Sequence, residues 1–242
     1  MEFDIRSFKT IDSTQDEIMR RYRVSARPGT VVISDVQTKG RGRGARPWDS
    51  EDGNLAASLL WHAAGAGHQS PIVSDISLIV AVALHRAVAS FLDNPIALRI
   101  KWPNDLILGN MKCAGILIER PDPEWFVIGT GVNIKTAAEG RAKMADVTKD
   151  VPTARALLDR YLSHFTQVME TYQAQGLAPI RAAWMDRAYG VGQPMSIRLP
   201  HDTFEARFEG LADNGACIAR LPDQSIRYVT TGEVFFGVVP SI

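Results

Sequence analysis

Arginine and glycine alternate in the segment Gly40-Arg41-Gly42-Arg43-Gly44-Ala45-Arg46-Pro47-Trp48. Glycine lets the backbone approach a phosphate chain closely, and the forked guanidinium of arginine binds phosphate through two parallel hydrogen bonds. Trp48 adds a flat ring on which a base could stack. The residue types therefore favour a lid over a nucleotide, although a solvated basic loop and an RNA-binding tract have the same composition. The spacing is not that of a Walker loop, which needs Gly-Lys followed by Ser or Thr.

A second polar segment, Lys101-Trp102-Pro103-Asn104-Asp105, follows a short apolar run. Proline forces a turn there, so the Asn104 and Asp105 side chains are expected to project beyond the end of a strand. Taken alone, the segment is also what an Asx turn before a hairpin requires.

Two further segments place cationic or small residues at the ends of apolar strands. Lys112 precedes the apolar run Cys113–Glu119 and therefore lies at the mouth of a buried strand. The segment Gly129-Thr130-Gly131-Val132-Asn133 contains small residues that let another backbone or a ligand approach a sheet. Each segment also has a purely structural explanation when it is considered alone.

With Asp12-Ser13-Thr14 and Gln37, these four segments occur in the order seen in biotin–protein ligases. That family's pattern is Asp-Ser-Thr, then Gln-x-x-Gly-Arg-Gly-Arg-x-Gly-Arg-x-Trp, then Lys-Trp-Pro-Asn-Asp, then Lys-x-x-Gly-Ile-Leu-x-Glu, then Gly-x-Asn. The resemblance is dense from Ile11 to Ile134 and weaker in the rest of the chain. Five motifs in one order are far more specific than any one of them, so the chain resembles an ATP-dependent biotin–protein ligase.

The resemblance implies a role for individual residues. Lys112 would bridge the biotin carboxylate and the α-phosphate of ATP, and Arg41 and Arg43 would grip phosphate or carboxylate. Asp105 would accept a proton from the acceptor lysine, coordinate Mg²⁺ or simply hold the turn. The implied biotin-binding residues are Ser13, Thr14, Gln15, Gln37, Gly40, Arg41, Gly42, Arg43, Lys112 and Gly115. The implied residues for ATP or the adenylate are Arg41, Arg43, Trp48, Asn54, Lys112 and Asn133. Mg²⁺ is expected to arrive with the nucleotide, without a metal site made by the protein alone.

The Asp-Ser-Thr turn and the glutamine after the second strand are expected to recognise the ureido ring of biotin. Hydroxyl and amide groups of Ser13, Thr14 and Gln37 could hydrogen-bond this ring, and they would be left unpaired against lipoate or octanoate. Ser13 is also a candidate N-cap for the helix that follows. The glycine-rich loop would exclude water from an acyl-adenylate that hydrolyses, and we predict that residues 39–52 are mobile without ligand.

Two positions depart from the family's pattern. Ala45-Arg46 stands where the family has its second Gly-Arg pair, with a glycine one position early at Gly44. Gly237 stands where better-studied members place an arginine. The folding of the loop and any contact made by that arginine are therefore open in this chain.

Composition limits the other functions available to the chain. Lys plus Arg and Asp plus Glu both number 27, so there is no basic surplus of the kind that nucleic-acid binders use to displace counterions.

Cys113 and Cys217 show no metal spacing and favour a reducing cytoplasm. The segment after Met1 is charged rather than apolar, unlike a signal peptide. The apolar stretch 76–92 contains His85 and Arg86 and favours a core helix over a membrane span.

The order of elements that must position these residues predicts an α+β fold, a mixed sheet flanked by helices, over residues 1–189. Turn-separated strands from residue 190 to 242 predict a small SH3-like β-barrel. The expected helices are 15–23, 76–92, a long amphipathic helix from Pro152, and 179–187. The expected strands are 3–8, 30–36, 55–61, 98–102, 106–108, 113–119 and 125–129, with Gly109-Asn110 as a hairpin turn, and then 195–199, 204–211, 217–221, 227–231 and 234–239.

Three alternatives stay open at this point. A lipoate or octanoate ligase or transferase could share the sheet and the lysine, but would not need Arg41, Arg43 and Trp48 in this arrangement. A ligase that also binds DNA needs a helix-turn-helix segment before Asp12, where only eleven residues stand, so no DNA binding is expected. A catalytically inactive binding module is the third. The acceptor implied by the resemblance is a biotin carboxyl carrier protein or carboxylase carrier domain, and family members are monomers or homodimers.

Overall fold

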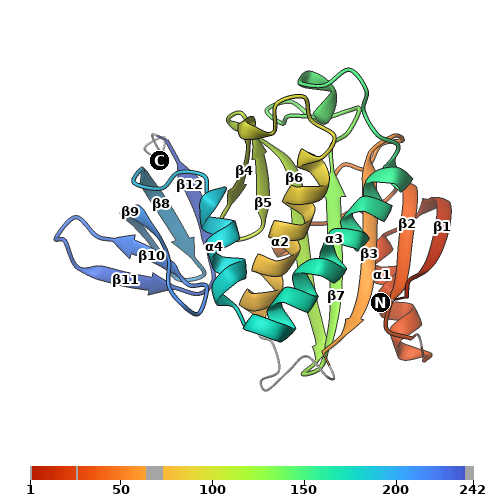
Figure 1. Cartoon of the computed structure of the whole chain (residues 1–242), viewed down its shortest axis with the longest axis horizontal. Helices are drawn as coiled ribbons and strands as arrows, with labels where there is room; N and C mark the ends of the chain where they lie inside the picture. The colour runs from red at the N-terminus through yellow and green to blue at the C-terminus, as the bar shows by residue number, and fades with distance from the viewer. Residues whose placement is uncertain (1, 26, 64–72, 238–242) are drawn as a thin grey trace.

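The computed structural model describes residues 2–25, 27–63 and 73–237, which form two β-sheets and four α-helices (Figure 1). The larger sheet is seven-stranded, in the order β1-β2-β3-β7-β6-β5-β4. Only β1 and β2 run parallel, so the sheet is mixed. Its strands are β1 (Asp4–Ile11), β2 (Thr30–Gln37), β3 (Leu55–His62), β4 (Leu98–Lys101), β5 (Asp105–Leu108), β6 (Met111–Asp122) and β7 (Trp125–Val132).

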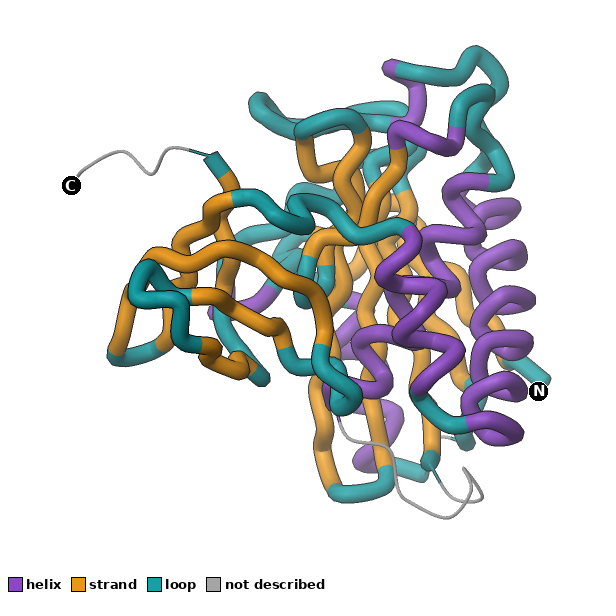
Figure 2. Tube along the Cα trace, turned by 60° about the vertical axis from the view of Figure 1, so that its left-hand side comes forward, coloured by secondary structure: helices purple, strands orange, loops and turns teal. Residues whose placement is uncertain are grey.

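The smaller sheet is antiparallel, in the order β11-β10-β9-β8-β12, and lies to one side of the helices in the turned view of Figure 2. Its strands are β8 (Pro194–Leu199), β9 (Asp202–Leu211), β10 (Cys217–Arg220), β11 (Ile226–Val229) and β12 (Glu233–Phe236). The helices are α1 (Thr14–Arg23), α2 (Val73–Ala89), α3 (Ala154–Gln175) and α4 (Ala178–Asp186). Three short 3₁₀ turns complete the described elements: η1 (Arg43–Ala45), η2 (Pro95–Ala97) and η3 (Met144–Asp146).

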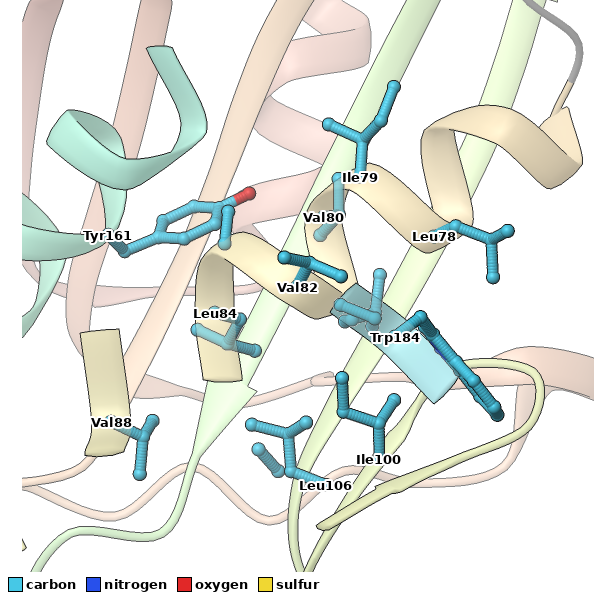
Figure 3. Packing of buried hydrophobic residues seen from close by; sticks show 14 of the residues in the cluster. Leu78, Ile79, Val80, Val82, Leu84, Val88, Ile100, Leu106, Tyr161 and Trp184 are labelled. Atoms are coloured by element: carbon cyan, nitrogen blue, oxygen red, sulfur yellow. The ribbon is translucent and has the colours of Figure 1, made fainter. Parts of the chain in front are cut away.

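The main core lies between one face of the seven-stranded sheet and helices α2, α3 and α4. Helix α2 is buried on nearly every side, because apolar residues occupy all of its turns. Tyr161 of α3 and Trp184 of α4 reach towards it in Figure 3. Each fully buried large apolar side chain contributes about 1.5–3 kcal/mol, so this helix fixes how α3 and α4 lie on the sheet.

The opposite face of the same sheet is only partly covered. Side chains alternate between faces along a strand, so Val31 joins the main core while Val32 faces the other way. There Val32 packs with Ile18 of α1, Leu60 and Val127 in a second, smaller cluster. Helix α1 therefore covers this face over β2, β3 and β7, and leaves β5 and the start of β6 without a helix above them.

The two sheets meet at the edge strand β4. The backbone N–H of Ile100 donates to Arg187, and the N–H of Tyr189 donates back to Ile100, both at 2.8 Å. The indole N–H of Trp102 donates to the carbonyl of Gly215 at 3.4 Å. These bonds cover an edge of the larger sheet and hold the smaller sheet beside it.

The predicted fold class is confirmed, with differences at the ends of elements. The third helix begins at Ala154 rather than Pro152, because Thr153 is the N-cap and its hydroxyl accepts from the N–H of Ala156 at 3.1 Å. The predicted helix 76–92 occupies Val73–Ala89. The predicted strand 234–239 is observed as Glu233–Phe236, and its last two residues lie outside the described part of the chain. Nowhere in the described ranges is a helix long and apolar enough to cross a membrane.

Buried His85 of α2 should make the fold sensitive to acid. Its Nε2 lies 3.1 Å from the carbonyl oxygen of Leu98, and burial lowers its pKa to about 4, helped by nearby Arg187 and Arg99. The imidazole is therefore neutral in the folded protein but protonates near pH 6.5 when unfolded. We expect stability to be complete above pH 6.5 and to fall between pH 6.5 and 4, by roughly 3 kcal/mol in total.

Urea unfolding at pH 7 and pH 4.5 measures this loss. The matched variant is His85→Gln, whose amide can still donate to Leu98 but does not titrate. It should lose less stability between the two pH values than the wild type. An equal loss in both proteins would show that other groups cause the acid sensitivity.

Candidate active site

A cavity of about 390 Å³ lies on the face of the larger sheet that α1 covers only in part. Its walls come from the start of α1 (Ser13–Gln15), from the loop residues between Arg41 and Asp49, from Lys101–Asp105 and from Glu233–Phe235 of β12. The floor comes from β3, β6 and β7. Segments from both ends of the described chain therefore meet at one site.

The floor is made of small residues in neighbouring strands. The strand registers place Gly115, Gly131 and Ala56 side by side across β6, β7 and β3, with Asp105 next in the same row. The Trp48 ring lies directly on this row, because a Cβ added at Gly131 would be 2.4 Å from its Cε2 atom. A Cβ at Gly115 would be 3.1 Å from the same ring. A side chain at Gly131 would therefore collide with the ring, and one at Gly115 would press against it.

The loop that carries Trp48 is fastened at its base by Arg41. The two terminal nitrogens of this guanidinium bind Glu119 at 2.6 Å and Asp16 at 2.8 Å. The hydrogen bonds to Glu119 hold the pKa of Arg41 above its usual value. Arg41 lines the cavity as predicted, but its guanidinium is bound to the chain's own carboxylates. Gly40 does not line the cavity, and its carbonyl accepts from the N–H of Trp48 at 2.9 Å.

The tip of the loop is the 3₁₀ turn η1, and it presents Arg43. Arg43 is half-buried and lines the cavity, and its guanidinium has no hydrogen-bond or ion-pair partner among the residues the structure describes. Gly44 and Ala45 both have positive φ, 63° and 57°. Because this conformation costs an L-residue about 1–2 kcal/mol, the departure at Ala45 leaves the turn intact but strained.

One end of the cavity is lined by uncharged hydrogen-bonding groups. The N–H and hydroxyl of Thr14 donate to Gln37 Oε1 at 2.8 and 3.0 Å. The Ser58 hydroxyl donates to Gln15 Oε1 at 2.9 Å. Ser13 serves as the N-cap of α1 and lines the cavity as well. The structure thus brings together the predicted Ser13, Thr14, Gln15 and Gln37, and adds Ser58, which no motif had indicated.

The other end of the cavity is cationic. The Lys112 ammonium lies 2.6 Å from Asp105 and 5.5 Å from the centre of the Trp48 ring. Lys101 is half-buried, and this burial lowers its pKa, as do the nearby charges of Lys112 and Arg141. Arg141 also lines the cavity, although no motif includes it. An isolated β-bridge between Arg141 and Lys112 places it there. The spacing of residues in the sequence does not reveal this bridge.

The two predicted asparagines have different positions. Asn133 is buried and lines the cavity, and its amide donates to the carbonyl of Ala142 at 3.0 Å. Asn54 does not line the cavity, and its predicted contact with the nucleotide stays a prediction. Its side-chain oxygen accepts from three successive backbone N–H groups, 134–136, and its amide nitrogen donates to Thr136. Asn54 therefore shapes the loop after β7.

Comparison with known proteins decides the family. The family described as "Biotin/lipoate A/B protein ligase family" matches residues 7–133, and "Biotin protein ligase C terminal domain" matches residues 190–237. A biotin–[acetyl-CoA-carboxylase] ligase of Paracoccus denitrificans is 33% identical over 219 residues, covering 85% of this chain and 90% of the relative. The chain belongs to the biotin/lipoate A/B protein ligase family. It is therefore an enzyme of the ligase class, as the motifs predicted.

Other members of the biotin/lipoate ligase family are similar over most of the chain. The bifunctional ligase/repressor BirA of Bacillus spizizenii is 28% identical and covers 94% of this chain and 72% of the relative. The solved structure of the Aquifex aeolicus biotin protein ligase in complex with biotin and ATP has a TM-score of 0.84 at 21% identity. It covers 97% of this chain and 98% of the other, so the two share their fold.

The contact between Trp48 and the glycine floor can be tested directly. Gly131→Ala should push the indole off the floor and loosen the loop, because the new Cβ needs space that the ring occupies. Amide hydrogen exchange over residues 40–48 should become faster by about tenfold, the equivalent of losing about 1.4 kcal/mol of local stability. The same substitution in a Trp48→Ala background should add little. An equal acceleration in both backgrounds would mean that the alanine disturbs β7 itself.

Proposed function

We propose that this chain is an ATP-dependent biotin–protein ligase that first forms biotinoyl-AMP and then transfers biotin to a lysine of a carrier protein. One observation carries this proposal. A single cavity joins an uncharged hydrogen-bonding end, around Thr14 and Gln37, to a cationic end, around Lys112 and Arg43. The two ends of biotin match the two ends of this cavity, because biotin has an uncharged ureido ring at one end and a carboxylate at the other.

Activation must bring two anions together. A carboxylate oxygen of biotin attacks the α-phosphorus of ATP, an anhydride bond forms, and pyrophosphate leaves with the electron pair of the broken P–O bond. Lys112 supplies a compact positive charge between carboxylate and α-phosphate, and unpaired Arg43 supplies a guanidinium from the loop above. Asp105 holds the Lys112 ammonium in place.

The nucleotide would lie at the cationic end, beneath the loop. Trp48 covers the adenine and Asn133 lies beside it, as the resemblance implies. In the described ranges no group of three or more His, Cys, Asp or Glu residues is arranged to hold a metal ion. Mg²⁺ usually keeps several waters and binds through phosphates with one or two carboxylates. Asp105 and Asp49 line the cavity and fit such an ion, which would neutralise phosphate charge.

Selectivity for biotin would come from the uncharged end. Thr14, Gln37, Ser58 and Gln15 form one hydrogen-bonded network at this end. A ureido ring can replace these bonds with its own, whereas the dithiolane of lipoate cannot. Leaving such buried polar groups unpaired is costly, and sites of this kind discriminate strongly.

The second step would transfer biotin to the acceptor lysine of a carboxyl carrier domain. At pH 7 this amine is mostly protonated, which costs about 4–5 kcal/mol for a reference pKa of 10.4. Asp105 is the candidate for taking up the proton, because its carboxylate lines the cavity beside Lys112. Cys113 and Cys217 are buried free thiols, which suits the reducing cytoplasm in which we place the enzyme.

Exchange of labelled pyrophosphate into ATP tests the first step. We expect exchange that depends on biotin, and incubation with a carrier domain should add one biotin by intact mass. Lipoate should support exchange at least about a hundredfold less well, because it leaves the ureido-binding groups unpaired. Exchange with lipoate alone would identify a lipoate ligase. No exchange with either acid would identify a binding module.

Lys112→Ala should separate chemistry from binding. We expect adenylate formation to slow by about a hundredfold or more, as when one donor to developing negative charge is removed. Biotin affinity, measured by calorimetry, should fall by less than about tenfold, because the ureido end is intact. Lys143→Ala is the control, since Lys143 pairs with Asp146 on the surface outside the cavity. Equal losses of rate and affinity in Lys112→Ala would mean that Lys112 only binds biotin.

A further inference from the structure

Residues 40–48, which we call the arginine loop, form a short hairpin over the cavity. Arg41 and Pro47 are opposite each other in an isolated antiparallel bridge. Next to this bridge, the N–H of Trp48 donates to the carbonyl of Gly40 at 2.9 Å. The hairpin is therefore one small unit, and whatever holds the Arg41 side chain also sets where Trp48 lies.

The Arg41 guanidinium is bound by two carboxylates from different elements. Glu119 of β6 accepts a forked pair of hydrogen bonds, at 2.6 and 3.0 Å, from the two terminal nitrogens. Asp16, in the first turn of α1, accepts a third hydrogen bond at 2.8 Å. A planar guanidinium that is bound in this way has a fixed orientation, unlike the point charge of a lysine. We call the arrangement of Asp16, Arg41 and Glu119 the Arg41 clamp.

The Arg41 clamp lies beside the uncharged end of the cavity. Asp16 follows directly after Ser13–Gln15, which line this end. Glu119 is four residues beyond Gly115 in β6, so the two residues face the same side of the sheet, about 13 Å apart. The arginine loop is thus fastened at Glu119 and rests on the floor near Gly115 through the Trp48 ring.

A second ion pair also holds the arginine loop, but it is the weaker of the two fastenings. Arg46 makes one contact with Glu233 of β12, and the Arg46 side chain is 58% exposed. The Arg41 side chain is only 27% exposed and makes three hydrogen bonds to carboxylates. Exposed ion pairs lose most of their strength to solvent, whereas forked bonds between charged groups are stronger. The position of the loop therefore depends mainly on the Arg41 clamp.

The two acids of the clamp lie outside the cavity, whose lining includes Arg41 but neither Asp16 nor Glu119. They would therefore act on the reaction only through Arg41. The proposed reaction gives such a role a purpose, because the acyl-adenylate must stay in the cavity until a carrier arrives. If it escapes, any free amine can attack its carbonyl carbon. The new C–N bond forms, the C–O bond to phosphate breaks, AMP leaves with the electron pair, and the amine proton passes to water.

We propose that Asp16 and Glu119 are positioning residues that keep the arginine loop closed over the acyl-adenylate until a carrier lysine takes the acyl group. This inference rests on the proposed function. It gives the Arg41 guanidinium the task of holding the loop, in place of the ligand contact that the resemblance implies. Because Asp16 belongs to the same helical turn as the residues at the uncharged end, a ligand that fixes this turn also fixes the fastening of the loop.

The test uses Glu119→Gln, which keeps the size of the side chain and removes its charge. The protein is incubated with biotin, ATP and Mg²⁺ in the presence of serum albumin and without a carrier domain. We expect the biotin found on albumin by intact mass, and the release of AMP, to rise about tenfold, because hydrogen bonds to a charged group are lost. The first turnover of pyrophosphate release should change less than about threefold, because the cationic end is untouched. Asp16→Asn should give a smaller rise, since Asp16 accepts one hydrogen bond and Glu119 accepts two.

Glu17→Gln is the matched control, because Glu17 belongs to α1 but pairs with Arg20 and Arg21 outside the cavity. It should leave the labelling of albumin at the wild-type level. Arg41→Lys keeps the positive charge without the fork, so it should release as much adenylate as Glu119→Gln. The two changes together should add little, because each of them breaks the same contact.

Amide hydrogen exchange gives a measurement that does not depend on activity. Without ligand, exchange over residues 40–48 should be about tenfold faster in Glu119→Gln than in Glu17→Gln. Labelling of albumin no higher than in Glu17→Gln would overturn the proposal and leave the proposed function standing. Adenylate formation that falls as far as leakage rises would overturn it as well, because the acids would then serve the chemistry or the fold. A wild-type protein that forms no adenylate with biotin would refute the proposed function, and this inference with it.

Discussion

The site depends on one steric constraint, the absence of side chains on the strands beneath Trp48. Gly115 and Gly131 lie side by side in β6 and β7, so an indole can rest directly on the backbone of the sheet. If Gly131 carried a side chain, the indole could not rest on the floor in this way. The main core, on the other face of the same strands, makes those strands stiff enough to serve as a floor.

The cationic side chains around the cavity fall into two groups. Some are paired with carboxylates of the chain itself, and others are available to bind a ligand. Arg41 and Arg46 of the loop are bound to acids on α1, β6 and β12, and they set where the loop lies. Arg43, Lys101 and Arg141 have no carboxylate partner in the described ranges and line the cavity. Lys112 has features of both groups. Its ammonium is paired with Asp105, and it also lies near the ring of Trp48 in the cavity. This division suits a reaction in which two anions must meet after the loop has closed.

Much of the fold and part of the site follow from local patterns in the sequence. The apolar spacing of α2, the N-cap at Ser13 and the positions of the floor glycines are encoded within a few residues of where they act. What the sequence does not reveal depends on pairing between distant strands. Asn54 looked available to a nucleotide, but its oxygen is used by three backbone groups about eighty residues later. Glu233 and Phe235 line the cavity although they belong to the smaller sheet, at the far end of the described chain.

The ion pair between Arg46 and Glu233 has a consequence for the making of the enzyme. The two residues are 187 positions apart, and Glu233 of β12 lines the cavity. At about 5–20 residues per second, a ribosome needs roughly 10–40 seconds to reach Glu233 after it has made Arg46. In the later part of that interval, after Gly131 has been made, the nascent chain carries its glycine floor and its arginine loop without the strand β12 that completes the cavity. The cavity can therefore be completed only late in translation, after the ribosome has made the strands of the smaller sheet.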